Sequence, residues 1–406
     1  MLVIELTEHE FRPNLALPDE LAALLTARFA EMLDVTPAWT AGHYKLRAGP
    51  FVGVVSLPGL TVRILPKVPL TNLFAMLTLA YDLVDLRPEP AAFQRLESLF
   101  EFLVDIFASQ VQNMLRRGLY RASVEIQDNI PLIRGQIRFA DHLRQNRITR
   151  HRHVCRFTEV SVDIAENQIL YLACAWLARL HYEDDWLAGR LRRLTHALAQ
   201  LGVGTPAMSG RWPRSYTLPE IVFHRLNSHY RPTIHLARLL LDMAGLEPAE
   251  GEEPFFSFLI DMNRLFERYI AQLLARDLPM VGLEVDLQPR LPLDQAGQVP
   301  IRPDIVIRQA GRPILVVDTK YKRLAEGQVE QPDLFQVLAY CRALLIDQAM
   351  LIYPAAGATE RTIRVRDGAS VVEMVFFTLD GSLAELQAEE GRLVAEVTIR
   401  QADQPR

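Results

Sequence analysis

Residues 301–320 read IRPDIVIRQAGRPILVVDTK. Two runs rich in β-branched residues, 304–308 and 314–320, flank a five-residue break with Gly311 at its centre. Apolar runs on either side of a break that contains glycine and proline are typical of two antiparallel strands joined by a turn. The stretch therefore predicts a β-hairpin.

The predicted hairpin brings two carboxylates together. Symmetric pairing about Gly311 joins position 306 to 316 and 308 to 314, and it places Asp304 opposite Asp318 with Cβ atoms about 5 Å apart. Two like charges in this position destabilise the ribbon unless a cation neutralises them. Because side chains alternate along a strand, Lys320 shares the face of Asp318, whereas Thr319 points away. A carboxylate pair beside an ammonium is what a hydrolytic site with a divalent metal requires, since Mg²⁺ prefers oxygen ligands and a lysine can orient or deprotonate a bound water.

Composition restricts the class of protein. A chain of 406 residues, half of them apolar and 23% charged, is typical of a soluble globular protein with two or three domains. No apolar run reaches the roughly 20 residues that span a bilayer, and no secretory signal is evident, so we expect no membrane partner. Three widely separated cysteines favour a reducing cytoplasm. The net charge of −5 gives no global nucleic-acid signature, so any DNA contact must come from local basic surface or from a partner.

The strongest candidate for a domain boundary is the acidic break GLEPAEGEEP at 245–254. We expect a mixed α/β N-terminal domain over 1–90, a mainly helical middle region over 91–250, and a domain around the hairpin over 255–406. Strands alternate with helices in the last region, and the fold class is therefore a mixed α/β (α+β) layer.

Two predicted helices flank the hairpin. Apolar residues from 258 to 274 trace one helical stripe, with Glu267 just beyond its rim. Pro332 can begin a helix over 332–346, which places Gln336 and Tyr340 on one face at a spacing of four. Both helices would pack on the sheet that contains the hairpin, so their polar side chains would come near its carboxylates.

The interval 134–156 is strongly basic, with seven arginines, three histidines and one acid. It can be a solvated face with scattered ion pairs or a surface that contacts phosphate or an acidic partner, and the sequence supports both equally. His151, His153 and Cys155 alternate along a predicted strand, but zinc is the less favoured interpretation because no second half-site follows. Lys67 is explained equally well as a functional residue and as a solvated hairpin end. No phosphate-binding loop of the type Gly-x-x-x-x-Gly-Lys-Ser/Thr occurs, so we expect no nucleotide hydrolysis by this chain itself.

The pattern Pro303-Asp304, thirteen residues, then Asp318-Thr319-Lys320 resembles the active-site motif of the PD-(D/E)xK nuclease superfamily. A longer ordered set resembles the McrC family, the endonuclease subunit of the McrBC methylation-dependent restriction systems. The members of that set are LTVRILPK at 60–67, RGQI at 134–137, DIAENQIL at 163–170, MNRLFE at 262–267, DTKYK at 318–322 and QVLAY at 336–340.

The resemblance implies a restriction-endonuclease-like domain over 255–406, with Mg²⁺ as cofactor and Mn²⁺ as a substitute. Asp304 and Asp318 would bind the metal with help from the backbone carbonyl of Thr319. Lys320 would position the attacking water and stabilise the charge that develops on phosphorus. Glu267 would act as an auxiliary acid, through a metal-bound water or a second metal.

The resemblance also implies that Gln336 holds active-site water or the phosphate. Tyr340 is the weaker match, because a tyrosine at helical spacing commonly belongs to the core. The family acts on DNA together with an AAA+ GTPase ring of the McrB type. The ring reads modified cytosine, while the McrC subunit docks through its N-terminal region (here 1–90), stimulates GTP hydrolysis and cuts.

Two alternatives remain open at this stage. A RecB-like repair nuclease uses a similar motif with a helix glutamine and tyrosine, and it would depend on DNA ends. A relative with an iron–sulfur cluster would need four cysteines, and this chain has three. The second alternative is a non-catalytic adaptor that only activates an AAA+ partner.

Overall fold

The computed structural model describes residues 2–83, 96–148, 151–180, 182, 185–204, 218–243, 256–322, 324, 330–354, 361–366 and 370–402. These residues form ten α-helices and five β-sheets, which confirms the mixed α/β class. None of the helices in these ranges is long and apolar enough to cross a membrane. The chain divides into two compact units, Met1–Leu99 with Ser257–Arg406, and Phe100–Phe256. The predicted boundary at 245–254 lies outside the described residues.

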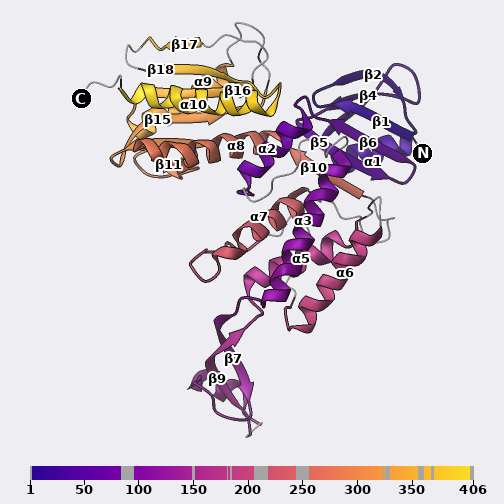
Figure 1. Ribbon diagram of the computed structural model, residues 1–406, viewed down its shortest axis with the longest axis vertical. Coiled ribbons are helices and arrows are strands. Elements are labelled where there is room, and N and C mark those ends of the chain that lie inside the picture. The colour runs from indigo at the N-terminus through magenta and orange to yellow at the C-terminus, as the bar shows by residue number, and fades with distance from the viewer. Residues whose placement is uncertain are drawn as a thin grey trace. The chain divides into compact units, whose positions relative to one another are not determined.

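A six-stranded sheet carries the predicted hairpin (Figure 1). Three of its inner strands, β15, β16 and β18, run parallel to one another, and the remaining pairings are antiparallel. The strand order is β11 (Glu284–Leu287), β14 (Ile305–Gln309), β15 (Arg312–Thr319), β16 (Gln348–Pro354), β18 (Val371–Phe377) and β17 (Arg361–Arg364). A separate two-stranded ribbon, β12 (Leu291–Pro292) with β13 (Pro300–Ile301), precedes β14.

The hairpin of β14 and β15 forms with a tighter turn than the sequence predicted. Val306 pairs with Val316 as expected, but a bulge after position 307 pairs Arg308 with Pro313 instead of with residue 314. The turn consists of Ala310 and Gly311 alone, both with positive φ (49° and 77°). This is the two-residue type I′ geometry, whose twist matches the flanking strands, so the chain needs no five-residue break.

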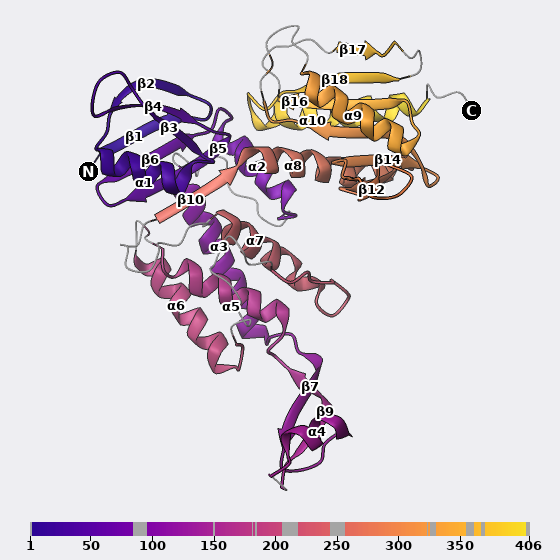
Figure 2. The same cartoon turned by 180° about the vertical axis from the view of Figure 1, so that it is seen from behind.

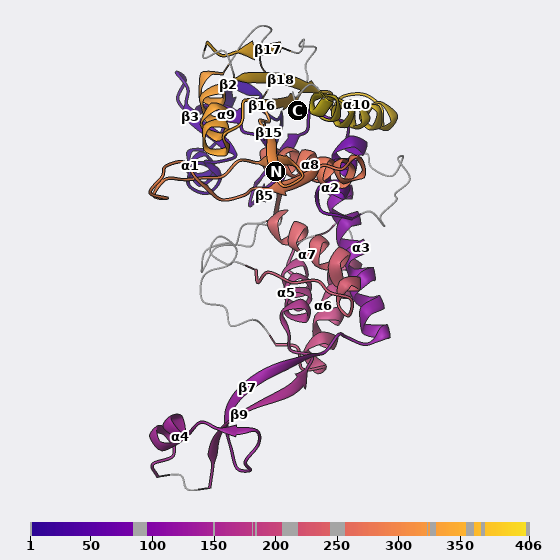
Figure 3. The same ribbon diagram turned by 90° about the vertical axis from the view of Figure 1, so that its left-hand side faces the viewer.

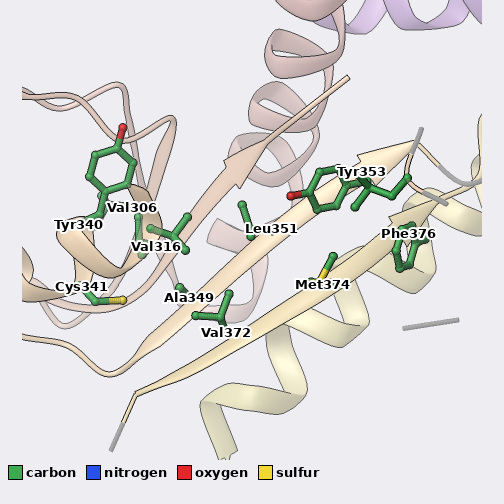
Figure 4. Close-up of a cluster of buried hydrophobic side chains, with 12 residues drawn as sticks. Val306, Val316, Tyr340, Cys341, Ala349, Leu351, Tyr353, Val372, Met374 and Phe376 are labelled. Atoms are coloured by element: carbon green, nitrogen blue, oxygen red, sulfur yellow. The ribbon is translucent and has the colours of Figure 1, made fainter. Parts of the chain in front are cut away.

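The sheet is buried on both faces. Alternate residues of β16 and β18 point into one hydrophobic cluster together with Tyr340 and Cys341 of α9 (Gln331–Leu344) (Figure 4). The C-terminal helix α10 (Leu383–Ala402), which the sequence analysis did not predict, lies on the opposite side of the sheet from α9 (Figure 3). Helix α8 (Met262–Asp277) joins α10 there, since Tyr269 donates a hydrogen bond of 2.6 Å to Glu390 and packs on Phe377.

The same unit contains the N-terminal sheets. One has the order β1 (Leu2–Thr7), β6 (Leu60–Leu65), β5 (Phe51–Leu57), β10 (Phe256–Asp261), and it includes the predicted hairpin of β5 and β6. The other has the order β2 (Phe11–Ala16), β4 (His43–Ala48), β3 (Leu33–Pro37), accompanied by helices α1 (Asp19–Phe29) and α2 (Leu70–Ala80). Helix α2 packs on α8, which ties these sheets to the six-stranded one. The sequence predicts separate domains over 1–90 and 255–406, and the described parts of both ranges lie in this one compact unit.

The helical stripe predicted from residue 258 begins too early. Residues 258–261 belong to strand β10, which lies beside β5, and helix α8 begins at Met262. Asp261 ends the strand and caps the helix, because its side chain accepts hydrogen bonds from the backbone N–H groups of Asn263 and Arg264. Gly53 permits the pairing, since a Cβ there would lie 2.0 Å from the Phe258 carbonyl oxygen.

The second unit combines a helical bundle with a small sheet (Figure 2). Its helices are α3 (Leu96–Arg117), α5 (Ala165–Leu177), α6 (Asp185–Gln200) and α7 (Arg231–Met243), with a 3₁₀ turn over Ser228–Tyr230. The basic interval lies on β8 (Gln136–Ile137), α4 (Phe139–Gln145) and β9 (His153–Ser161), which pairs with β7 (Ala122–Ile130). Several of its arginines have acidic partners, as in Arg134–Glu159 at 3.3 Å and Arg156–Glu125 at 3.0 Å.

Candidate functional site

The end of the hairpin brings Asp304, Asp318 and Lys320 together. Asp304 immediately precedes β14, Asp318 is the penultimate residue of β15, and Lys320 follows β15. The pairing of Ile305 with Val317, continued by one residue, puts the two aspartates opposite each other, as the sequence predicted. The Nζ atom of Lys320 lies 2.7 Å from Oδ2 of Asp318, which is completely buried. The site is therefore an ion pair between a buried aspartate and a partly buried lysine, with a second carboxylate facing it.

Thr319 contacts the site in a way that strand alternation did not predict. Its backbone N–H and its hydroxyl both donate to Oδ2 of Asp304, at 2.9 and 3.1 Å. The side chain was expected to point away from the aspartates. The difference arises because Asp304 lies just before β14 begins, so its side chain is free to bend toward the neighbouring strand. Two donors thus fix the orientation of the Asp304 carboxylate.

The pKa values of Asp318 and Lys320 are both shifted by burial and by neighbouring charges. Burial, followed by the negative charge of Asp304, raises the pKa of Asp318 to about 6, although Lys320 opposes the change. Burial alone would lower the pKa of Lys320, but Asp318 outweighs it, so the pKa of Lys320 is raised and the side chain is an ammonium. Oδ1 of Asp318 is buried without a hydrogen-bond donor. A buried carboxylate oxygen that lacks a donor is costly unless something positive satisfies it.

These residues fit a hard divalent cation. Among the described residues no three His, Cys, Asp or Glu side chains converge as a ready-made ligand group, either here or around His153 and Cys155. Mg²⁺ does not need such a group, because it commonly binds through one or two carboxylates and keeps waters and substrate phosphate oxygens as its other ligands. Asp304 and Asp318 supply the two carboxylates, and the donor-free Oδ1 atom of Asp318 is the oxygen that a cation would satisfy.

Glu267 reaches the site from α8. Burial, and then the negative charge of Asp304, raise its pKa, whereas a hydrogen bond from Gln288 works in the opposite direction. Nε2 of Gln288 donates to Oε1 of Glu267, and Oε1 of Gln288 accepts from Arg302. Gln288 and Arg302 could not be identified from the sequence, because nothing in their local pattern indicates a contact with residue 267.

Gln336 and Tyr340 form a second side of the site. Nε2 of Gln336 donates to the Tyr340 hydroxyl at 2.7 Å, and that hydroxyl donates to the carbonyl oxygen of Arg302 at 3.3 Å. Tyr340 also belongs to the hydrophobic cluster, in agreement with the core interpretation of a tyrosine at helical spacing. Burial raises its pKa, with further contributions from the charges of Asp318 and Asp304.

A second ion pair behind the site was missed in the sequence. Asp333, in the first turn of α9, is buried, and its Oδ2 atom lies 2.7 Å from Nζ of Lys322 and accepts a 2.7 Å hydrogen bond from Tyr353. Its charge adds to the rise in the pKa of Asp318. An acid in the first turn of a helix is usually explained by the helix dipole alone, so its position gave no specific signal.

Comparisons with known proteins place the chain in a family. Residues 46–354 match the family described as "McrBC 5-methylcytosine restriction system component". The "Type IV methyl-directed restriction enzyme EcoKMcrBC" of Escherichia coli (strain K12) is 22% identical over 322 residues, which cover 71% of this chain and 86% of that protein.

One solved structure shares the fold over nearly the whole chain. A chain in the "half-complex from tetradecameric assembly of Thermococcus gammatolerans McrB AAA+ hexamers with bound McrC" superposes with a TM-score of 0.53 at 20% identity, over 97% of this chain and 100% of that chain. A chain of the Thermococcus gammatolerans McrBC complex, solved by cryo-electron microscopy, aligns over 68% of this chain and 88% of its own length, at 22% identity and a TM-score of 0.40. The family match spans most of the sequence, and the chain belongs to the family of McrBC 5-methylcytosine restriction-system components.

Proposed function

We propose that this chain is the Mg²⁺-dependent DNA endonuclease subunit of a McrBC-type restriction complex, with a PD-(D/E)xK active site at the end of β15. The observation that carries the proposal is the buried Asp318–Lys320 pair with Asp304 facing it. Asp318 is buried and its two charged neighbours are partly buried, an arrangement that is costly for folding and is retained where chemistry needs it. The family to which the chain belongs supports DNA as the substrate.

Each residue has a role that follows from its contacts. Asp304, oriented by two donors from Thr319, and Asp318, with its donor-free oxygen, would hold the cation. When bound, Mg²⁺ lowers the pKa of a water and neutralises charge on the phosphate. Lys320 is protonated and its side chain is 24% exposed, so it would donate hydrogen bonds to the attacking water or to a phosphate oxygen, stabilising negative charge as it develops. Glu267 would hold a water on the side of Asp304.

The partner would be an AAA+ GTPase ring of the McrB type. The solved relative contains McrB AAA+ hexamers with bound McrC, and the fold of its similar chain extends over nearly all of this chain. We propose that the ring selects methylcytosine-containing DNA, that residues 1–90 dock on it, and that docking stimulates GTP hydrolysis. The net charge of −5 predicts weak DNA binding by the isolated chain.

The decisive experiment follows supercoiled, cytosine-methylated plasmid in the presence of the partner, GTP and Mg²⁺. The wild-type chain should open the circle and linearise it, which a nuclease that requires DNA ends cannot do. Asp304→Asn and Lys320→Met should abolish cutting, while Glu284→Gln, an exposed acid on the edge strand β11, should leave it unchanged. Both site variants should still stimulate the partner's GTPase. Undiminished cutting by either site variant would refute the site, and stimulation without any cutting by the wild type would favour the non-catalytic adaptor.

A further inference from the structure

We propose that Gln288 is the positioning residue of this site: it fixes Glu267 relative to Asp304 through one backbone and one side-chain contact. The inference rests on the proposed nuclease function and extends it to a residue outside the motif. Gln288 directly follows β11, and it connects three segments that are far apart in the sequence, namely α8, the end of β11 and the residues before β14.

The backbone of Gln288 is held in an unusual conformation. Its φ of 47° lies in the left-handed region, which a residue with a side chain occupies only when its surroundings enforce it. Its N–H donates to the carbonyl oxygen of Asp304 at 2.8 Å, which continues the ladder between β11 and β14 by one residue. The backbone of Gln288 is therefore hydrogen-bonded directly to Asp304, which carries one of the two proposed metal-binding carboxylates.

The side chain uses both ends of its amide. Nε2 donates to Glu267 and Oε1 accepts from Arg302, so the acid and the guanidinium are held on either side of one planar group. A carboxylate at position 288 would repel Glu267, and an apolar side chain would leave it free to rotate. Only an amide of this length satisfies both neighbours at once.

The contacts of Gln288 serve the site more than the stability of the fold. The Gln288 side chain is exposed, so water can replace its hydrogen bonds at little cost to folding. Its removal releases the orientation of Glu267, however, and Glu267 lies near enough to Asp304 for that negative charge to raise its pKa. Partners that orient metal-site ligands typically contribute about 10- to 100-fold in metal affinity or activity.

The test separates positioning from folding by substituting glycine. Gln288→Gly removes the amide and also relieves the left-handed strain, so its thermal unfolding midpoint should equal or exceed that of the wild type. Ala310→Gly is the matched control, because Ala310 has nearly the same φ (49°) and lies in the hairpin turn, at the opposite end of β14 from Asp304. Gln288→Asn keeps an amide that tolerates this conformation but is one methylene too short to bridge both neighbours.

Two readouts decide the outcome: the Mn²⁺ affinity of the full chain by titration calorimetry, and the rate of plasmid cutting with the partner and GTP. We expect Gln288→Gly and Gln288→Asn to lose about 10- to 100-fold in Mn²⁺ affinity, in cutting rate or in both. Ala310→Gly should keep the wild-type values of both. Wild-type affinity and rate in Gln288→Gly would overturn the proposal, as would an equal loss in Ala310→Gly. If the wild type bound Mn²⁺ but cut no DNA, the proposed function would fail. The calorimetric comparison of the variants would still test whether Gln288 contributes to metal affinity.

Discussion

Replacing Asp318 by asparagine should stabilise the metal-free protein at neutral pH while it abolishes activity. Asp318 is fully buried beside Asp304, and this environment raises its pKa from the ordinary 3.8 to about 6. Asparagine resembles the protonated acid in shape and carries no charge. The difference between the two pKa values corresponds to about 3 kcal/mol, at about 1.4 kcal/mol for each tenfold change in the equilibrium. The free energy of unfolding of Asp318→Asn should therefore exceed that of the wild type by up to about 3 kcal/mol at pH 7.

The sign of the pH dependence follows from the direction of the pKa change. Between pH 3.8 and 6 the folded state binds more protons at Asp318 than the unfolded state does. Stability of the wild type therefore falls as pH rises through this window, whereas Asp318→Asn lacks this contribution. The wild type and Asp318→Asn should have nearly the same stability below pH 4, and the variant should be the more stable protein above pH 6.

Hydrogen exchange of the β15 amides measures this difference locally. Wild type and variant are compared at the same pH in EDTA, with Asp34→Asn, an exposed acid on β3, as a control that should change stability by less than about 0.5 kcal/mol. Added Mg²⁺ at ten times its dissociation constant should stabilise the wild type by about 1.4 kcal/mol and leave the variant unchanged. Faster exchange in Asp318→Asn at pH 7 without metal would refute the claim that this carboxylate is a cost to the fold.

Other predictions concern the rest of the first unit. Gly53→Ala should disrupt the pairing of β5 with β10 and lower the thermal unfolding midpoint by several degrees, because its Cβ would meet the Phe258 carbonyl at 2.0 Å. Gly391→Ala, in α10 with open space around it, should instead raise stability by about 0.5–1 kcal/mol. Tyr321→Phe removes the 2.9 Å hydrogen bond from its hydroxyl to the buried Glu8, so it should cost about 1–3 kcal/mol in chemical denaturation. An unchanged midpoint in Gly53→Ala would contradict the close approach of the two strands.

The hairpin and its carboxylate pair could be predicted from the sequence because both depend on local pattern. The apolar runs specify strands, the pairing of Val306 with Val316 follows from symmetry about the turn, and Asp304 then has to face Asp318. The bulge could not be predicted, since it arises from the fit of a two-residue turn to the sheet twist.

Features that depend on contacts between residues far apart in the chain could not be predicted from the sequence. Residues 258–261 fit a helical stripe, yet they form a strand because β5 offers an edge that lies some 200 residues earlier in the chain. Gln288 is significant only through its left-handed backbone and its contact with Glu267, and neither leaves a periodic signal. Helix α10 was not predicted because its apolar residues pack on a face of the six-stranded sheet, and the strand order of that sheet cannot be read from sequence patterns.

The position of β10 has a consequence for biosynthesis. Strand β5 leaves the ribosome about 200 residues before β10, which completes that edge of its sheet, and the whole of the second unit is made in between. During that interval the N-terminal sheet has an unpaired edge, which is a site for wrong pairing and for chaperone binding. Every residue of the proposed active site is translated after β10. A chain that would cut DNA is thus assembled with its catalytic end last, and a prematurely terminated product lacks the residues needed for cleavage.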